Sequence, residues 1–339
     1  MSDRRDDPRS ADLLHGGNLA SVQALFPDAC LPWLDLSTGI NPWPFAYASV
    51  SAEAFEKLPT ASLQARAISA AANAFGCGSD RIVLTPGSQA AIQLMPLLCP
   101  MKRVGILGPT YSEHALSWLR AGAEVVQISA LPNASENFDA VVVVNPNNPD
   151  GRIHSHDDLL RLASDLEKKG GHIVVDEAFA DTDRHISLAA TELPSNVALL
   201  RSFGKFFGLA GVRLGAIISS PALVKAASLQ MGPWAVSGPA LEIGSQAYQN
   251  VEWQNSMRAR LAEATFALDQ ALGSVGIPAV GGTTLFRWIK TNDAHHVWRT
   301  LAGRGVYTRR FAWSATHLRI GIPATDVDRQ RLIEALRTV

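Results

Sequence analysis

The sequence predicts an α/β fold built around a mostly parallel sheet, and two observations support this prediction. Short, nearly continuous apolar runs recur through the middle of the chain, as expected of strands covered on both faces; they span residues 104–107, 124–128, 141–144, 173–175, 198–200 and 214–218. Helix-like segments such as 112–121 and 155–169 lie between several of these runs. This alternation of strand and helix is typical of a largely parallel sheet.

Length and composition indicate a globular protein of about two domains, because the chain has 339 residues and a domain has roughly 150. A hydrophobic content of 47% with 18% charged residues is far from the composition of disordered chains. The net charge of −1 is too small to bind nucleic acid through its phosphates, so we expect no nucleic-acid partner.

The carboxyl-terminal part of the chain shows a different pattern from the middle. We expect a long helical stretch over 239–272, strands near 283–289, 305–309 and 318–322, and helices over 293–303 and from Thr325 onward. These elements predict a smaller α+β domain at 235–339 beside a large domain at 46–234. Residues 1–45 are expected to form an amino-terminal arm that contributes to the small domain and the substrate site.

Cysteine usage and the amino terminus favour a cytoplasmic protein. The three cysteines, Cys30, Cys77 and Cys99, form no CxxC pair, so neither a disulfide framework nor a structural zinc site is indicated. The first ten residues carry charges of both signs instead of the apolar core of a signal peptide. No apolar run approaches the length of a membrane-spanning helix, so we expect no membrane partner.

A cluster of histidines and aspartates at 153–158, IHSHDD, allows two interpretations. It could bind a metal, or it could begin a helix, because Ser155 is followed three residues later by Asp158 as in a capping box. The apolar positions that follow, Leu159, Leu160, Leu162 and Leu166, are expected to face a core. We therefore predict a helix start and no metal site.

The most informative stretch, 202–215, contains one lysine among aromatic residues and glycines. No acidic residue lies in this stretch, and desolvation of Lys205 would keep part of its amine neutral and nucleophilic, as imine formation requires. Ser202 and Arg213 flank the lysine and could bind one anion together. The alternative is a surface lysine in a glycine-rich turn.

Further polar groups follow other predicted strands. Asp176 ends the apolar run 172–176, where a buried carboxylate needs a cationic partner such as a protonated ring nitrogen. The loop NPNNPDG follows the run VVVV and presents Asn147 and Asn148 as hydrogen-bonding side chains. Taken alone, Asp176 could be a helix cap or a member of an ion pair with an arginine, and the NPNNPDG loop could be only a turn.

An anion site is also predicted near the start of the sheet. The strand-like segment 81–86 is followed by Gly87, Ser88 and Gln89 and then by a helix-like segment, so free backbone N–H groups would face a phosphate. Tyr111 follows another strand-like run and could place its ring beside a planar group.

In this order along the chain, these motifs resemble the fold type I pyridoxal-phosphate-dependent transferases, the aspartate aminotransferase superfamily, over most of residues 35–325. The resemblance implies a large domain with a mostly parallel seven-stranded sheet flanked by helices, a smaller α+β domain, and pyridoxal 5′-phosphate as cofactor. It implies that Lys205 forms an imine with the cofactor, Asp176 pairs with the pyridine nitrogen and Tyr111 stacks on the ring. The remaining cofactor contacts that it implies are Asn148 at the ring oxygen and Gly87, Ser88, Gln89, Ser202 and Arg213 at the phosphate.

Two positions depart from the usual aminotransferase pattern. Phe179 stands where many members have a tyrosine that reaches the ring oxygen, and Leu58 stands where many have a tyrosine that crosses the dimer interface. Both departures argue against ordinary transamination.

The amino-terminal motifs indicate a branch of this superfamily. HGGN, which contains His15, Gly16 and Gly17, and DLSTGINP, which contains Asn41, together resemble the threonine-phosphate decarboxylase family. The resemblance implies the conversion of L-threonine O-3-phosphate to (R)-1-amino-2-propanol O-2-phosphate and CO2, for assembly of the cobalamin nucleotide loop. The small-molecule partner would then be a phosphorylated amino acid.

The substrate contacts implied by the resemblance include cations, because a phosphate and a carboxylate together call for more than one. Arg319 matches the arginine that binds a substrate carboxylate or other anion, and Arg309 is assigned to the substrate anion with Arg310 as an open alternative. His15, Gly16, Gly17, Asn41 and Asn148 complete the expected substrate site. Histidinol-phosphate aminotransferase is the alternative enzyme, a non-catalytic cofactor-binding sensor is a third possibility, and a homodimer is expected by resemblance.

Overall fold

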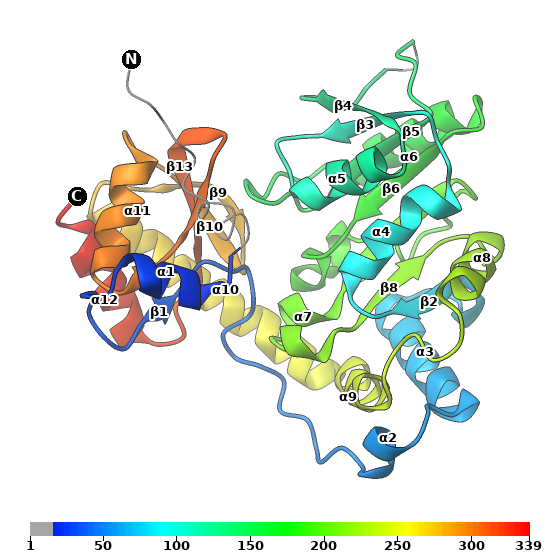
Figure 1. The fold of residues 1–339 in the computed structure, drawn as a ribbon, viewed down its shortest axis with the longest axis horizontal. Coiled ribbons are helices and arrows are strands. Elements are labelled where there is room, and N and C mark those ends of the chain that lie inside the picture. The colour runs from blue at the N-terminus through cyan, green and yellow to red at the C-terminus, as the bar shows by residue number, and fades with distance from the viewer. Residues whose placement is uncertain (1–15, 134) are drawn as a thin grey trace. The chain divides into compact units, whose positions relative to one another are not determined.

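The computed structural model describes residues 16–133 and 135–339, and the chain divides into two compact units (Figure 1). The larger unit comprises Trp43–Arg258, and the smaller unit comprises Met1–Pro42 and Ala259–Val339. Helix α10 (Val251–Ser274) begins in the larger unit and ends in the smaller one.

A seven-stranded sheet forms the centre of the larger unit, in the order β2-β8-β7-β6-β5-β3-β4. Only β8 runs antiparallel to its neighbours, so the predicted mostly parallel sheet is confirmed. The strands are β2 (Ile82–Thr85), β3 (Arg103–Leu107), β4 (Glu124–Ile128), β5 (Ala140–Val144), β6 (His172–Asp176), β7 (Val197–Ser202) and β8 (Gly215–Ile218). Every residue of β5 is buried, which explains its uninterrupted apolar sequence.

Helices cover the sheet of the larger unit. They are α2 (Glu53–Glu56), α3 (Ala61–Phe75), α4 (Ser88–Leu98), α5 (Ser112–Arg120), α6 (His156–Glu167), α7 (Phe203–Phe206), α8 (Pro221–Met231) and α9 (Gly238–Gln249). Short 3-10 helices lie at Ser79–Arg81, Ala180–Thr182, Arg184–Ile186 and Ala210–Val212. One core cluster joins Met95 of α4, Trp118 of α5 and Ala227 of α8 to strand residues such as Val142, so these three helices pack on one face.

The start of α6 confirms the predicted capping box. The Ser155 hydroxyl accepts the backbone N–H of Asp158 at 3.1 Å and donates to the Asp158 carboxylate at 2.7 Å. Leu159, Leu162 and Leu166 of the same helix are buried. The acidic side chains of this cluster therefore belong to a helix N-terminus.

The helical stretch expected over 239–272 is two helices, α9 and α10. Helix α9 ends at Gln249, and the next residue, Asn250, accepts the backbone N–H of Trp253 through its side-chain oxygen at 3.0 Å and so begins α10. Helix α9 packs against α3, which places it in the larger unit. The contacts therefore divide the chain after Arg258, whereas the sequence suggested a boundary at 234/235. Near the amino terminus, the contacts place the boundary after Pro42, whereas the sequence suggested residue 45.

The smaller unit contains an antiparallel sheet in the order β12-β13-β10-β9 and a separate parallel pair, β1-β11. Its strands are β1 (Leu34–Asp35), β9 (Ala279–Thr283), β10 (Phe286–Lys290), β11 (Val306–Tyr307), β12 (Arg309–Phe311) and β13 (Ser314–Gly321). Its helices, besides the later part of α10, are α1 (Leu19–Leu25), α11 (Ala294–Gly303) and α12 (Asp326–Leu336). Across the described ranges 16–133 and 135–339, no helix is both long enough and apolar enough to span a bilayer.

Candidate active site

The predicted cofactor residues of the larger unit come together at one edge of the seven-stranded sheet. Strands β2, β3, β5, β6 and β7 run in the same direction, so their carboxyl ends share this edge, where open α/β sheets bind ligands. Strand β8 runs the other way and therefore begins there. The predicted residues at this edge are Gly87, Ser88 and Gln89 after β2, Tyr111 after β3, Asn148 after β5, Asp176 at the end of β6, Ser202 at the end of β7, Lys205 in α7, and Arg213 before β8.

The anion cup predicted at Gly87 has a specific geometry. Gly87 has φ +84° and precedes α4, and no side chain caps the first turn of that helix. A Cβ at Gly87 would lie 2.7 Å from Nη2 of Arg213, and a Cβ at Gly215 would lie 2.6 Å from the backbone nitrogen of Ser88. The Arg213 guanidinium thus lies against Gly87, beside the N-terminus of α4. The cation and the free N–H groups of the helix are therefore adjacent, as an anion site requires.

Tyr111 and Gln89 are connected through a third residue, Glu113. The Tyr111 hydroxyl donates to Oε1 of Gln89 at 3.2 Å, and Nε2 of Gln89 donates to a carboxylate oxygen of Glu113 at 2.8 Å. Because the amide nitrogen faces the carboxylate, the amide oxygen is left to face the phenol. The first turn of α5 therefore holds a residue of the α4 N-terminus in one orientation.

Asp176 is 3% exposed and contacts a histidine that the sequence reasoning did not identify. Its Oδ1 accepts the backbone N–H of Ala178 at 2.9 Å, and its Oδ2 lies 2.9 Å from Nε2 of His114, which is itself 2% exposed. His114 follows Tyr111 by three residues, so it lies one helical turn along α5. That spacing is the signal that could have identified His114.

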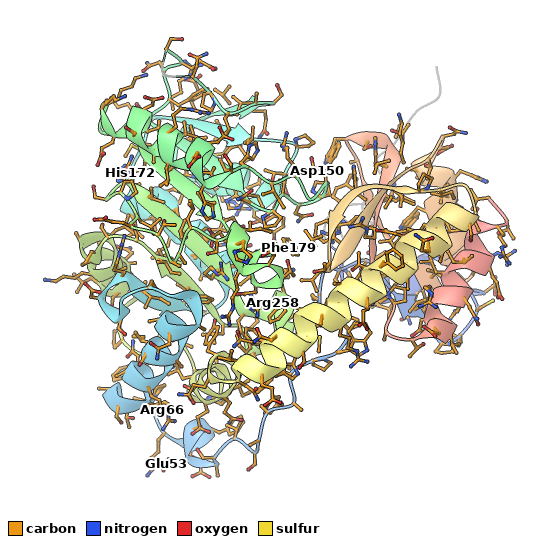
Figure 2. The ribbon with its side chains drawn as sticks, turned by 180° about the vertical axis from the view of Figure 1, so that it is seen from behind. Glu53, Arg66, Asp150, His172, Phe179 and Arg258 are labelled. Atoms are coloured by element: carbon orange, nitrogen blue, oxygen red, sulfur yellow. The ribbon has the colours of Figure 1, made fainter. Side chains whose placement is uncertain are left out.

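Lys205 lies in α7, a single turn between β7 and a glycine-rich segment. Phe203, Phe206 and Phe207 around it are each at most 1% exposed, whereas Lys205 is half-buried. The Lys205 amine lies 5.8 Å from the centroid of the Phe179 ring, which packs in the larger unit (Figure 2). The phenylalanine that replaces the usual tyrosine therefore forms an aromatic surface beside the lysine.

The loop after β5 uses its two central asparagines differently. Asn147 is 1% exposed; its amide nitrogen donates to Asp150 and to the carbonyl of Pro109, and its oxygen accepts the Thr110 hydroxyl at 2.7 Å. Asn147 thereby ties this loop to the loop that precedes Tyr111. Asn148 is only half-buried and is the asparagine of the two that is more accessible to a ligand.

A buried ion-pair network lies next to Asp176 and Ser202 in the sequence. Arg201, which is 2% exposed, donates to Glu177 at 2.6 Å and also to Asp181 and Ser187. Two carboxylates raise the pKa of Arg201, although burial opposes the charged form. Because Glu177 follows Asp176 and Arg201 precedes Ser202, the network fixes the ends of β6 and β7 against each other.

The predicted substrate arginines belong to the smaller unit. Arg309 of β12 lies directly opposite Arg319 of β13, so both side chains share one face of the sheet. Burial and the neighbouring Arg309 lower the pKa of Arg319 to about 9. Arg310 pairs with Leu318 and stacks its guanidinium 4.7 Å from the Trp298 ring centroid, so it lies on the opposite face. Of the two alternatives, Arg309 is therefore the one beside Arg319.

The amino-terminal motif residues are only partly described. Gly16, Gly17 and the buried Asn41 lie in the smaller unit with Arg309 and Arg319, whereas His15 lies outside the described residues. The Gly17 N–H donates to the Ser37 hydroxyl at 2.8 Å, which connects the two amino-terminal motifs.

Comparison with known proteins places the chain in a family. Residues 48–336 match the family described as aminotransferase class I and II. The chain is 39% identical to threonine-phosphate decarboxylase from Pseudomonas aeruginosa over 326 residues, which cover 96% of this chain and 97% of that protein. It is 37% identical to threonine-phosphate decarboxylase from a Sinorhizobium species over 329 residues, with coverage of 96% and 98%.

A solved structure has the same fold. Histidinol-phosphate aminotransferase from Sinorhizobium meliloti, in complex with pyridoxal-5′-phosphate, superimposes with a TM-score of 0.80 at 16% identity, covering 100% of this chain and 98% of that one. Given this fold and a family match that spans most of its length, the chain belongs to the aminotransferase class I and II family.

Proposed function

We propose that the chain decarboxylates L-threonine O-3-phosphate with pyridoxal 5′-phosphate as cofactor. The observation that carries the proposal is the Arg309–Arg319 pair, because two guanidinium groups on one face of the β12–β13 ladder suit a ligand that carries two anionic groups. A substrate with both a phosphate and a carboxylate matches such a pair, and the two relatives at 37–39% identity support the same substrate.

The residues at the edge of the larger sheet fit the proposed cofactor. The anion cup at Gly87, which a Cβ would fill, suits a phosphate. The buried Asp176 carboxylate suits a protonated ring nitrogen. Lys205 offers an amine to the aldehyde, and Tyr111 and Asn148 flank the same edge. When bound, pyridoxal 5′-phosphate supplies the electron sink that lets a bond at the substrate Cα break.

The remaining roles fall to side chains of this chain. Lys205 would hold the cofactor through its amine and would then give up this attachment to the substrate amine. After CO2 leaves, Lys205 would return a proton to the substrate Cα. Asp176, oriented by His114, would keep the proton on the ring nitrogen. Arg319 would bind the carboxylate, and Arg309, together with His15 and the glycines after it, would bind the phosphate.

Histidinol-phosphate aminotransferase is the second candidate, because it shares the fold and its substrate is also a phosphorylated amine. Two reactions separate the candidates. The holoenzyme is incubated with L-threonine O-3-phosphate alone, or with histidinol phosphate and 2-oxoglutarate. Release of CO2 in the first reaction supports the decarboxylase, whereas formation of glutamate only in the second would replace it by the aminotransferase.

Covalent attachment tests the cofactor assignment separately. Borohydride reduction of the holoenzyme, followed by peptide mass spectrometry, is expected to find the pyridoxyl group on Lys205. A label on another lysine would contradict the assignment, whatever reaction the enzyme catalyses.

A homodimer is part of the proposal. A pocket in the larger unit is lined by Tyr47, Phe55, Leu58 and Trp234, which are 46–71% exposed, and clustered exposed apolar side chains are typical of protein interfaces. Sedimentation of the purified protein tests this expectation. We further propose that the enzyme acts in the cytoplasm, which agrees with its three free cysteines, and supplies aminopropanol phosphate for cobalamin assembly.

A further inference from the structure

One buried serine of the smaller unit contacts both of the elements that we assign to the substrate anion. Ser37 is fully buried. Its carbonyl accepts a hydrogen bond from Nη2 of Arg319 at 2.9 Å, and its hydroxyl oxygen accepts the backbone N–H of Gly17 at 2.8 Å. Arg319 lies 282 residues from Ser37 in the sequence, so only the fold brings these groups together.

The orientation of Ser37 is itself fixed. Oδ1 of Asp35 accepts both the backbone N–H of Ser37 at 2.8 Å and its hydroxyl hydrogen at 2.6 Å. Because the hydroxyl hydrogen points to this carboxylate, the lone pairs of the same oxygen remain for the Gly17 N–H. Asp35 is anchored in turn, because β1 pairs with β11.

Gly16 comes so close to Ser37 that no side chain fits. A Cβ at Gly16 would lie 2.4 Å from the Ser37 carbonyl oxygen, the same oxygen that accepts from Arg319. Close approach to this carbonyl is a sufficient reason for glycine at this position. The Ser37 carbonyl thus lies against Gly16 and also accepts from the Arg319 guanidinium.

We propose that Ser37 is a positioning residue that joins the Gly16–Gly17 turn and Arg319 into one surface for the two anionic groups of the substrate, the phosphate at the turn and the carboxylate at Arg319. This inference rests on the proposed function, because it deepens the description of the same substrate site. The carbonyl fixes the plane of the guanidinium, which binds an oxyanion through two parallel N–H groups only when that plane is oriented. The hydroxyl holds the turn, so the glycine backbone stays beside the guanidinium.

Two variants disturb this arrangement by different means. Ser37→Ala removes the hydroxyl and releases the turn but keeps the carbonyl, whereas Gly16→Ala keeps the hydroxyl and pushes the turn away from the carbonyl. Gly303→Ala is the matched control, because a Cβ there meets nothing within 4 Å and its φ is not positive. All three are compared with the wild-type holoenzyme, in which the cofactor fills the cup of the larger unit.

The measurement is the KM for CO2 release from L-threonine O-3-phosphate and, separately, the Kd for inorganic phosphate by calorimetric titration, alongside pyridoxal 5′-phosphate affinity and Tm. Ser37→Ala and Gly16→Ala are each expected to raise the KM for phosphothreonine about tenfold, the cost of one mispositioned charge-assisted contact. Cofactor affinity is expected to match that of Gly303→Ala, because the residues assigned to the cofactor lie in the larger unit. The double variant is expected to have a KM no higher than that of Gly16→Ala, because both changes break the same connection.

Different results would overturn different claims. If both single variants keep the wild-type KM for phosphothreonine, or if they lose cofactor affinity to the same degree, Ser37 does not position the oxyanion site. If the wild type binds inorganic phosphate in a Ser37-dependent manner but releases no CO2 from phosphothreonine, the inference stands and the proposed substrate is wrong. A wild type that does neither contradicts both.

Discussion

Replacing Arg201 by methionine tests whether the buried ion-pair network holds the cofactor edge of the larger unit. Arg201 is 2% exposed and Glu177 is fully buried, so Arg201→Met leaves a carboxylate that has lost its cation and cannot reach water. The carboxylate also loses a charge-assisted hydrogen bond of 2.6 Å. Removing one partner of such a buried pair costs about 3–5 kcal/mol, so we expect the free energy of unfolding to fall by that amount.

The assay is guanidinium unfolding followed by circular dichroism, with two comparison variants. Arg161→Met breaks an exposed pair with the same 2.6 Å separation, to Asp158, and is expected to leave the unfolding midpoint unchanged. The double variant Glu177→Gln/Arg201→Met removes one of the two stranded charges, leaving that of Asp181, and is expected to recover part of the loss. A loss for Arg201→Met no greater than that for Arg161→Met would show that the buried network does not stabilise the larger unit.

Three further predictions concern the two anion sites and Asp176. His114→Ala removes a hydrogen bond to the buried Asp176 and is expected to weaken pyridoxal 5′-phosphate binding about tenfold, measured by fluorescence titration of the apoenzyme; unchanged affinity would contradict the orienting role. Gly87→Ala places a Cβ 2.7 Å from Nη2 of Arg213 at a φ of +84°, and should weaken binding of the phosphorylated cofactor but not of pyridoxal; equal losses would argue against a phosphate cup. Burial and the neighbouring Arg309 lower the pKa of Arg319 to about 9, so its charge is present at lower pH and is lost as the pH rises through 9. The Kd for phosphothreonine should therefore rise above this pH. Arg309→Gln should move that rise to higher pH, because it removes the neighbouring positive charge.

Much of the fold could be predicted because strands buried on both faces leave a clear sequence signal. The runs at 141–144 and 173–175 became β5 and β6 with changes of one residue at their ends. The capping box at Ser155 was equally readable, because its two partners are three residues apart. The break between α9 and α10 at Asn250 could not be predicted from the sequence. An asparagine inside an apolar helical pattern begins a new helix only when the tertiary packing turns the chain there.

The site was predictable where it depends on local motifs and not where it depends on packing. Gly87, Lys205 and Asp176 stand beside strand ends, and the sheet brings them to one edge. His114 was missed because its partner is 62 residues away and becomes its neighbour only through folding. The roles assigned to these residues remain predictions, as does that of His15, which lies outside the described residues.

The choice between Arg309 and Arg310 shows why the substrate arginines needed the structure. Adjacent residues of a strand point to opposite faces, so the sequence left both open. The register of β12 against β13 places Arg309 opposite Arg319 and turns Arg310 toward Trp298. A shift of one residue in this register would have exchanged the two.

A labelled substrate decides whether this chain breaks the bond between Cα and the carboxylate of a phosphorylated amino acid. The holoenzyme is incubated with carboxyl-labelled L-threonine O-3-phosphate in the absence of any keto acid, and labelled CO2 is measured together with aminopropanol phosphate. We expect both to form in equal amounts, and Lys205→Ala to form neither. Substrate that keeps its labelled carboxylate, or amine that leaves while the carboxylate stays, would contradict the proposed decarboxylation.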